Sequence, residues 1–502
     1  QAEDGIRDVE RSRGLGDVYK RQTMINRLKK IILFLLCTLV IGSCRIPDSL
    51  IAASENEKIR FDYEELADKI AKTYLNYAFN RTYGLAQFDI NITTKKPGDH
   101  MEGADISSPC AQALCIVLLD VMTSYSQNKS YAKVLEKAIK TFPKFRRQDG
   151  MLVNYDLKTN SRQNIFKEHG LWEWWGIPLA TPEILLKLRK LINTYKALYK
   201  SYVITIPIKE TECYLFRETA FRPETEIHHT AAIIQQYLYI YQVTGRKKYI
   251  TYAKNLIDTW WKIRNPQTNL TVDWIRSDGA LDNNWDIVAY WPLLDAHINF
   301  YLITGEQKYL FRAQTFGDAL IKYAYQADKR SFALAVRPDG QIMTRDGLNG
   351  IMIPEYDEAQ VALALLRLYI LTDKTEYFKV AKEIAQKWST KSIYQENIGM
   401  GSLWSTSAGR GLTIHLLLDL YLLTGKQQWK DRAMNVADDL IENYITPEGF
   451  VKYDKHSHLF WVESAYIDVS ALLRLPDSSR HTYRSRVSIP ELRKESEKFK
   501  KR

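Results

Sequence analysis

The sequence lacks the motifs on which most metal, nucleotide and serine-hydrolase sites depend. It has no CxxC pair, no HExxH motif, no GxSxG turn, no P-loop and no dinucleotide-binding glycine fingerprint after a strand. Only five cysteines occur in 502 residues, and Cys110 and Cys115 lie on one predicted helix at a poor spacing for a disulfide. We therefore expect no metal site and no cofactor.

A hydrophobic run long enough to cross a membrane is also missing near the start of the chain. The apolar run Ile31–Ile41 is shorter than the roughly 20 residues that a membrane helix needs. Basic residues precede it, and it ends in IGSC at Cys44, as in a cleaved signal peptide. This pattern over 24–43 resembles bacterial lipoprotein signals, which implies lipidation of Cys44, anchoring to a membrane, and a tether over 44–62.

The alternative for this segment is a plain secretory signal in which Cys44 has no role. Residues 1–23 precede Met24 and look like translated upstream sequence rather than protein, so we leave them out of the fold. Either signal predicts an exported protein, in the periplasm or at the cell surface.

The body of the chain carries almost no net charge, because most of the net charge of +11 lies in its two ends. Residues 1–44 carry eight Lys/Arg against five Asp/Glu, and the tail 480–502 carries nine against three. Such a tail is usually solvated, so we expect 480–502 to be disordered. An exported protein without a recognition motif is not expected to bind nucleic acid.

The chain is rich in one repeated pattern: YIYQVTGRKKYITYA, FYLITGEQKYLFRA, LYILTDKTEYFKVA and LYLLTGKQQWKDRA. In each copy an aromatic residue follows a threonine by five positions, and an alanine follows by nine. The copies contain Thr244, Tyr249 and Ala253; Thr304, Tyr309 and Ala313; Thr372, Tyr377 and Ala381; Thr424, Trp429 and Ala433. Apolar residues at helical spacing flank each corner, so each copy predicts an αα-hairpin in which Gly or Asp ends the first helix.

About six such hairpins account for the body of the chain. Four less regular helical stretches precede the repeats, at 64–79, 107–125, 130–142 and 182–203, and 460–475 has no outer partner. Pairing of 460–475 with the first stretch would close a ring. We predict an all-α fold, an (α/α)6 toroid over 63–479, with the more apolar helix of each hairpin inside. The one β-like run, YVITIPI at 202–208, is expected in a connection.

Polar and aromatic residues gather at the heads of the predicted inner helices, which would meet on one face of the ring. The heads hold His228 and His229; Asn284, Trp285, Asp286 and Trp291; Glu355, Tyr356 and Asp357; Trp404 and Arg410. The final helix adds Trp461, Glu463 and Tyr466. Flat aromatic faces suit sugar rings, Asn and Arg reach hydroxyl and carboxylate groups, and paired carboxylates can act on a glycosidic bond. Taken singly, Asp286 or Asp357 is more often a helix cap, and Arg410 a tie between loops.

Three short motifs carry a family resemblance: Asp286 with Pro292 in DIVAYWPLL, VRPDGQ at 336–341, and STSAGRGL at 405–412. With the hairpin series, over 225–445, they resemble the six-hairpin glycosidase superfamily, and within it the unsaturated glucuronyl and rhamnogalacturonyl hydrolases. The resemblance implies that Asp286 is the general acid/base. The chain departs from that family at His228–His229, where the family tends to have His-Asp.

The first functional reading is therefore a glycoside hydrolase acting on uronate-containing oligosaccharides, with Asp286 as acid/base and Asp357 or Glu355 as the second carboxylate. The second is a polysaccharide lyase or uronate epimerase, in which His229 or His228 acts with Tyr356, Asn284 and Arg410. The third is a noncatalytic, lipid-anchored glycan-binding protein. Each reading expects an acidic oligosaccharide or polysaccharide as partner.

Overall fold

The chain divides into two compact units, Gln1–Phe61 and Asp62–Arg502. The computed structural model describes most of the second unit: residues 62–97, 105–126, 128–146, 153–162, 196, 203–208, 211–216, 224–272, 274–276, 278–281, 285–286, 290–343, 354–390, 405–480 and 489–500. For His228, His229, Trp285, Asp286 and a few others it describes the backbone alone. The predictions for 1–23, 24–43 and Cys44 lie outside these residues. No helix in the described part is long and apolar enough to span a membrane.

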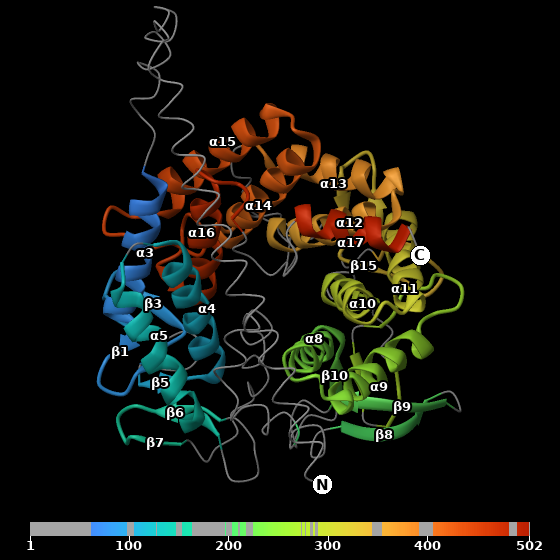
Figure 1. Ribbon diagram of the computed structural model, residues 1–502, viewed down its shortest axis with the longest axis horizontal. Helices are drawn as coiled ribbons and strands as arrows, with labels where there is room; N and C mark the ends of the chain where they lie inside the picture. The colour runs from blue at the N-terminus through green and yellow to red at the C-terminus, as the bar shows by residue number, and fades with distance from the viewer. Residues whose placement is uncertain are drawn as a thin grey trace, which may run out of the picture. The chain divides into compact units, whose positions relative to one another are not determined.

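Twelve of the described helices alternate between an inner and an outer position (Figure 1). The inner helices are α4 (Pro109–Tyr125), α8 (Ile227–Thr244), α10 (Tyr290–Thr304), α12 (Glu355–Thr372), α14 (Ser407–Thr424) and α16 (Val462–Arg474). The outer helices are α3 (Tyr63–Tyr77), α5 (Ser130–Thr141), α9 (Lys247–Ile263), α11 (Gln307–Ala319), α13 (Thr375–Trp388) and α15 (Gln427–Tyr444).

Contacts between neighbouring inner helices run in the order α8, α10, α12, α14, α16 and α4. The last inner helix, α16, also packs against α3, the first outer helix, as the sequence predicted for 460–475. Inner helices are buried on nearly all sides, whereas outer helices bury one stripe, such as Trp429, Ala433 and Val436 of α15. The predicted all-α, (α/α)6 toroid is confirmed.

The repeated corner residues each have a structural role. The hydroxyl group of each corner threonine donates to the carbonyl four residues earlier and accepts from the N–H two residues later, at Thr244, Thr304, Thr372 and Thr424. The next residue is left-handed in every copy: Gly245, Gly305, Asp373 and Gly425. The alanine nine positions on is fully buried each time. The corner pattern thus ends one helix and lets the next pack closely.

Tyrosines of three outer helices, α5, α11 and α13, each join their helix to another outer helix. Tyr309 of α11 donates to Asp258 of α9, and Tyr377 of α13 donates to Asp318 of α11 at 2.6 Å. Between α5 and α3, Tyr131 donates to Asp68 at 2.9 Å. In two copies of the sequence repeat, the aromatic residue therefore links neighbouring outer helices.

Short antiparallel strands tie the segment entering an inner helix to the segment leaving its outer partner. The pairs are β5 (Ile106–Ser107) with β6 (Tyr155–Asp156), β10 (Glu224–Glu226) with β11 (Trp274–Arg276), β12 (Trp285–Asp286) with β15 (Ala335–Val336), and β16 (Leu459–Trp461) with β3 (Asp89–Asn91). The remaining strands are β1 (Phe79–Asn80), β2 (Leu85–Ala86), β4 (Lys96–Pro97), β7 (Ser161–Arg162), β13 (Tyr325–Gln326), β14 (Ser331–Phe332), and the hairpin of β8 (Val203–Ile208) with β9 (Thr211–Phe216). The β-like run at 202–208 does lie in a connection.

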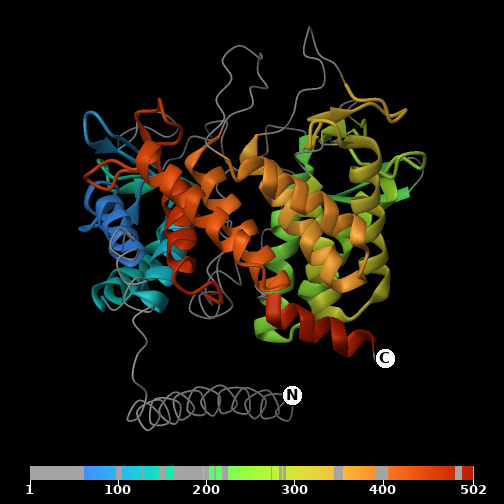
Figure 2. The ribbon, with the colours of Figure 1, turned by 90° about the horizontal axis from the view of Figure 1, so that it is seen from above.

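The predicted disordered tail is wrong for Ile489–Lys500, which forms helix α17. Ile489 and Leu492 are buried, and α17 packs against α12 and α14. The Arg493 guanidinium donates to the carbonyl of Leu423, beside the corner of α14. Figure 2 shows α17 at the edge of the body away from the short strands. Apolar residues spaced for one helix face outweigh the high charge of this segment.

Gly425→Ala isolates the contribution of the left-handed corner residue. No atom lies within 4 Å of the position that the new methyl group would take, so the only cost is the backbone conformation. We expect the free energy of unfolding in urea to fall by about 1 kcal/mol. The control is Lys426→Ala, an exposed neighbour with ordinary backbone angles, which should change it little. Equal effects of the two variants would refute this account of the corner.

Candidate functional site

The first turns of two inner helices that are not neighbours in the ring meet through their side chains. The phenolic hydroxyl of Tyr356 in α12 donates to Glu463 Oε1 in α16 at 2.6 Å, although α14 lies between these helices in the ring. Both residues are half-buried. The heads of α12, α14 and α16 therefore converge. We call the heads of α8, α10, α12, α14 and α16 the mouth.

Glu355 and Arg410, both predicted to bind substrate, instead bind each other inside the protein. The Arg410 guanidinium contacts both carboxylate oxygens of Glu355, at 2.8 and 3.0 Å, and both side chains are fully buried. Thr413 also donates to Glu355, at 2.7 Å. Burial raises the pKa of Glu355, although Arg410 and the neighbouring hydroxyl groups oppose that shift. Direct substrate binding by these two residues is thus wrong for this structure: neither side chain is accessible.

Arg410 also holds together the elements around the head of α14. Its guanidinium donates to the carbonyl of Thr390 at 2.8 Å and to that of Trp388 at 3.1 Å, at the end of α13. Asp439 of α15 lies 3.5 Å away on the other side. Arg410 therefore joins four helices, and the structural reading of this residue, a tie between segments, is the one that fits.

The rest of the STSAGRGL segment serves close packing. Thr406 caps α14 by accepting from the N–H of Gly409 at 2.9 Å. A methyl group at Gly409 would come within 3.1 Å of the Tyr356 backbone nitrogen, and one at Gly411 within 2.5 Å of Asp468 Oδ1. The glycines let α12 and α16 approach α14. The motif that carried part of the family resemblance is thus explained by packing.

Asp468 of α16 is a buried acid that the sequence analysis did not single out. The side chain is fully buried beside Gly411, and among the described residues neither carboxyl oxygen has a partner at hydrogen-bonding geometry, although the Ser407 hydroxyl group is near enough to lower its pKa somewhat. Burial raises its pKa well above the usual range, and the nearby Glu355 raises it further. Burial therefore favours the neutral form of this carboxyl group in α16.

The VRPDGQ motif is also one copy of a structural repeat. Gly279, Gly340 and Gly449 all have positive φ in tight turns after an outer helix, within RSDGAL, RPDGQI and TPEGFV. Each turn is closed by an antiparallel bridge, such as Val336 with Ile342. The repeated Asp-Gly or Glu-Gly makes the turn, so this motif supports the fold rather than a particular activity.

The structure places the remaining predicted site residues as follows. Asp286 lies in β12 opposite Ala335, four residues before α10 begins, so it is not the cap of that helix. Asp357 is half-buried in the first turn of α12, and His228 and His229 lie in the first turn of α8. Asn284 and Trp404 lie outside the described residues.

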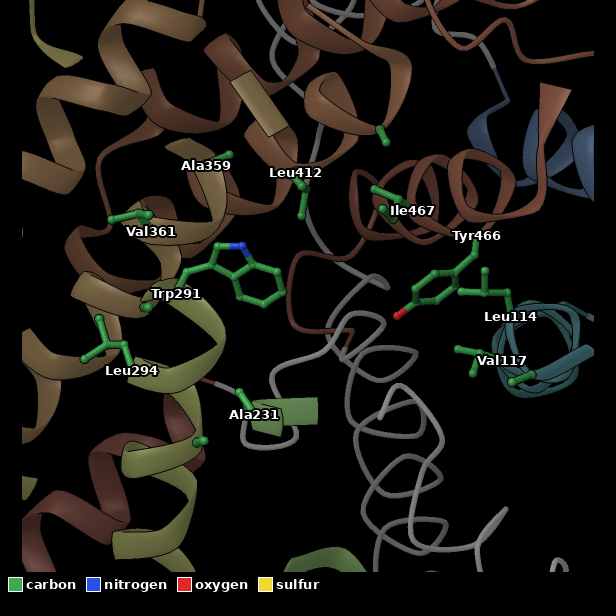
Figure 3. Packing of buried hydrophobic residues seen from close by; sticks show 14 of the residues in the cluster. Leu114, Val117, Ala231, Trp291, Leu294, Ala359, Val361, Leu412, Tyr466 and Ile467 are labelled. Carbon is green, nitrogen blue, oxygen red and sulfur yellow. The ribbon is translucent and has the colours of Figure 1, made fainter. Parts of the chain in front are cut away.

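Trp291 is a core residue near the beginning of α10. Its side chain is 5% exposed and belongs to the hydrophobic core. Figure 3 shows Trp291 of α10 and Tyr466 of α16 pointing toward one another across the interior. Trp291 therefore packs with core residues in the first turn of α10.

Two aromatic residues beside Glu463 complete this side of the mouth. Trp461, in β16, packs against Tyr453 in a tilted arrangement, with ring centres 4.2 Å apart and an angle of 31° between the rings. Tyr453 was missed because nothing in its local sequence marks it; its position depends on the loop after α15 folding back to α14.

In the part of the chain that the structure describes, no three His, Cys, Asp or Glu side chains are grouped to hold a metal ion.

Comparisons with known proteins agree with this fold. A family model described as periplasmic pectate lyase matches residues 312–500. A search of curated protein sequences gave no match. Among solved structures, cellobiose 2-epimerase from Bacillus thermoamylovorans is similar at 10% identity and TM-score 0.52, over 82% of this chain and 98% of that one.

Two further solved structures are similar to the same extent. D-mannose isomerase matches at 12% identity and TM-score 0.51, over 83% of this chain and 97% of that one. A glycoside hydrolase family 76 mannosidase from Bacteroides thetaiotaomicron matches at 13% identity and TM-score 0.51, over 84% and 100%. These proteins share the six-hairpin toroid that the sequence predicted.

Glu355→Gln tests whether Glu355 is structural. Removing one partner leaves the Arg410 charge buried, so we expect the free energy of unfolding to fall by about 3–5 kcal/mol. The control is Glu463→Gln, a half-buried acid at the same mouth, which should cost far less in the same urea titration. A Glu355→Gln protein of unchanged stability would contradict this structural role.

Proposed function

We propose that this protein is a carbohydrate-active enzyme that hydrolyses glycosidic bonds at the mouth of the toroid. The observation that carries the proposal is the Tyr356–Glu463 hydrogen bond, which brings a carboxylate and an aromatic hydroxyl together over the head of α14. Asp357 adds a second half-buried carboxylate from the same turn as Tyr356. A cluster of carboxylates beside aromatic rings is what glycoside hydrolysis needs.

In this proposal the carboxyl groups divide the chemistry between them. Asp286, in protonated form, gives its proton to the oxygen of the leaving sugar as the glycosidic bond breaks. Asp357 or Glu463, ionised, takes a proton from the water molecule that bonds to the anomeric carbon. Tyr356 orients Glu463 by donating to Oε1. Glu355 and Arg410 position the backbone of this turn without touching substrate.

A lyase is the second candidate, favoured by the family model described as periplasmic pectate lyase. A lyase removes the C5 proton of a uronate and eliminates the leaving oxygen, and His229 or His228 would be its base. The accessible groups in the described first turns of α12 and α16 are the carboxylates of Asp357 and Glu463, which repel a uronate anion. Hydrolysis therefore ranks first, and a uronate in the substrate is supported by the family model alone. An epimerase, which leaves the glycosidic bond intact, is a third outcome.

We also propose that the protein is exported and held to a membrane by a lipid on Cys44. The apolar run before IGSC and the description of the family model as periplasmic support this.

An absorbance assay with Asp286→Asn tests the proposed chemistry. The panel is neutral oligosaccharides, acidic glycans and their lyase digests. A hydrolase of unsaturated uronides consumes the ultraviolet absorbance of the digests, a lyase creates absorbance from intact acidic glycans, and a hydrolase of other glycans releases reducing sugar without either change. We expect hydrolysis, with turnover at least about a hundredfold lower in Asp286→Asn because Asn cannot donate the proton.

The thermal midpoint of Asp286→Asn should stay close to that of the wild type, since Asn keeps the size and polarity of the side chain. Full activity in this variant would exclude Asp286 as the acid. New absorbance from intact acidic glycans would replace the hydrolase proposal with the lyase.

Cys44→Ser tests the anchor. With no thiol to acylate, the protein should move from the membrane fraction to the soluble exported fraction, while Cys37→Ser should behave as the wild type. Membrane association that persists in Cys44→Ser would refute lipidation.

A further inference from the structure

Helix α14 packs closely against both of its inner neighbours through two glycines near its start. A methyl group at Gly409 would come within 3.1 Å of the Tyr356 backbone nitrogen of α12. One at Gly411 would come within 2.8 Å of Ile467 of α16. The hydrogen bond from Tyr356 to Glu463 joins these same two neighbours, α12 and α16. The position of Glu463 beside Tyr356 therefore depends on how closely α16 packs against α14.

Asp468 lies within the contact between α14 and α16. Its Oδ1 atom lies 2.5 Å from the position that a methyl group at Gly411 would take, and its side chain is fully buried. Among the described residues, neither its carboxyl oxygens nor the buried hydroxyl group of Ser407 beside it have a partner at hydrogen-bonding geometry. An ionised carboxylate without partners is strongly disfavoured away from water. The neutral acid is the form that suits this contact.

Two other buried acids of the same region show what a buried carboxylate requires. Glu355 is bound by the Arg410 guanidinium at 2.8 Å. Glu358 accepts from the Lys387 ammonium group at 2.8 Å and from a backbone N–H at 2.9 Å. Both cations are thus bound to other acids. The negative charge of Glu355 adds to burial in raising the pKa of Asp468.

The other elements packed against α16 are α3, α4 and β16, and they bring no buried charge to Asp468 in the described part of the chain. Burial raises the pKa of the Cys115 thiol of α4, which keeps this group neutral. The hydroxyl group of Tyr74 in α3 donates to a backbone carbonyl at 2.6 Å. The charged residues of α3 and α4 are exposed or half-buried: Glu64, Glu65, Asp68, Lys69, Lys72 and Asp120.

We propose that Asp468 is a positioning residue whose proton keeps α16 packed against α14, so that loss of this proton moves Glu463 away from Tyr356. A carboxylate formed in this contact needs water, which reaches it only when the two helices separate. The mouth therefore loosens as the pH rises. Asp468 is buried and touches no substrate, so this inference holds for any reaction at the mouth.

Unfolding in urea at several pH values tests this role with Asp468→Asn, which keeps the shape of the side chain but cannot ionise. The unfolded chain loses the proton of Asp468 above about pH 4, whereas the folded protein keeps it to a higher pH. The stability that the proton gives is therefore complete below about pH 4 and is lost as the pH rises toward the raised pKa. The unfolding constant of the wild type should rise, relative to that of the variant, by up to about tenfold per pH unit.

Hydrogen exchange followed by mass spectrometry measures the local effect. Amide protection in α16 is compared with that in α9, a helix of the same molecule that does not pack against α16, after correction for intrinsic base catalysis. Between about pH 6 and about pH 9, protection of α16 in the wild type should fall relative to α9, by up to about tenfold per pH unit. In Asp468→Asn the ratio should stay constant. The wild-type measurement needs no variant to fold.

The matched control is Glu358→Gln, which removes an equally buried carboxylate that has its own donors. This variant should be less stable than the wild type at neutral pH, and it should keep the fall in α16 protection as the pH rises. The proposal is overturned if Asp468→Asn keeps the wild-type dependence on pH, if α9 loses as much protection as α16, or if α16 in the wild type loses none.

Discussion

The arrangement of the helix heads at the mouth depends on the hydrogen bonds that one buried arginine requires. Arg410 has no access to water, so each of its donors must find an acceptor within the protein. It finds Glu355 on α12, two carbonyls at the end of α13, and Asp439 on α15. That requirement fixes the first turn of α12 and, with it, Tyr356. Glycines on either side of Arg410 then let α12 and α16 close on α14. The accessible groups of the mouth are placed by a buried pair that has no access to substrate.

Most of the fold was predictable from local sequence because the hairpins share the same pattern of residues at their corners. The corner threonine, the left-handed residue after it and the buried alanine are local requirements, so they recur at fixed spacing. The closure of the ring by α16 was predicted because 460–475 was the one helical stretch without an outer partner. Helix α17 was missed because its composition is mostly charged, while its packing depends on only a few buried positions. Average charge does not report the spacing of apolar residues.

The candidate site was less predictable, because it depends on distances between segments far apart in the sequence. The heads at 228–229, 355–357 and 410 do lie in the first turns of inner helices, whereas Trp285 and Asp286 lie in β12 before α10. Sequence alone could not tell that Glu355 and Arg410 would pair while Tyr356 and Glu463 remained half-exposed. Tyr453 lacks any local signal, since its position depends on the turn after α15 and on a backbone hydrogen bond to Ser407 of α14. Two motifs behind the family resemblance, VRPDGQ and STSAGRGL, form a turn and a closely packed helix start in this structure.

The central claim is that sugar is bound over the converging heads of α12, α14 and α16. The most direct measurement is a crystal structure of the Asp286→Asn protein with a uronate-containing oligosaccharide. We predict that the sugar lies beside Tyr356 and Glu463. Sugar bound at the corner end beside α17, or on the outer helices with the mouth empty, would contradict the account.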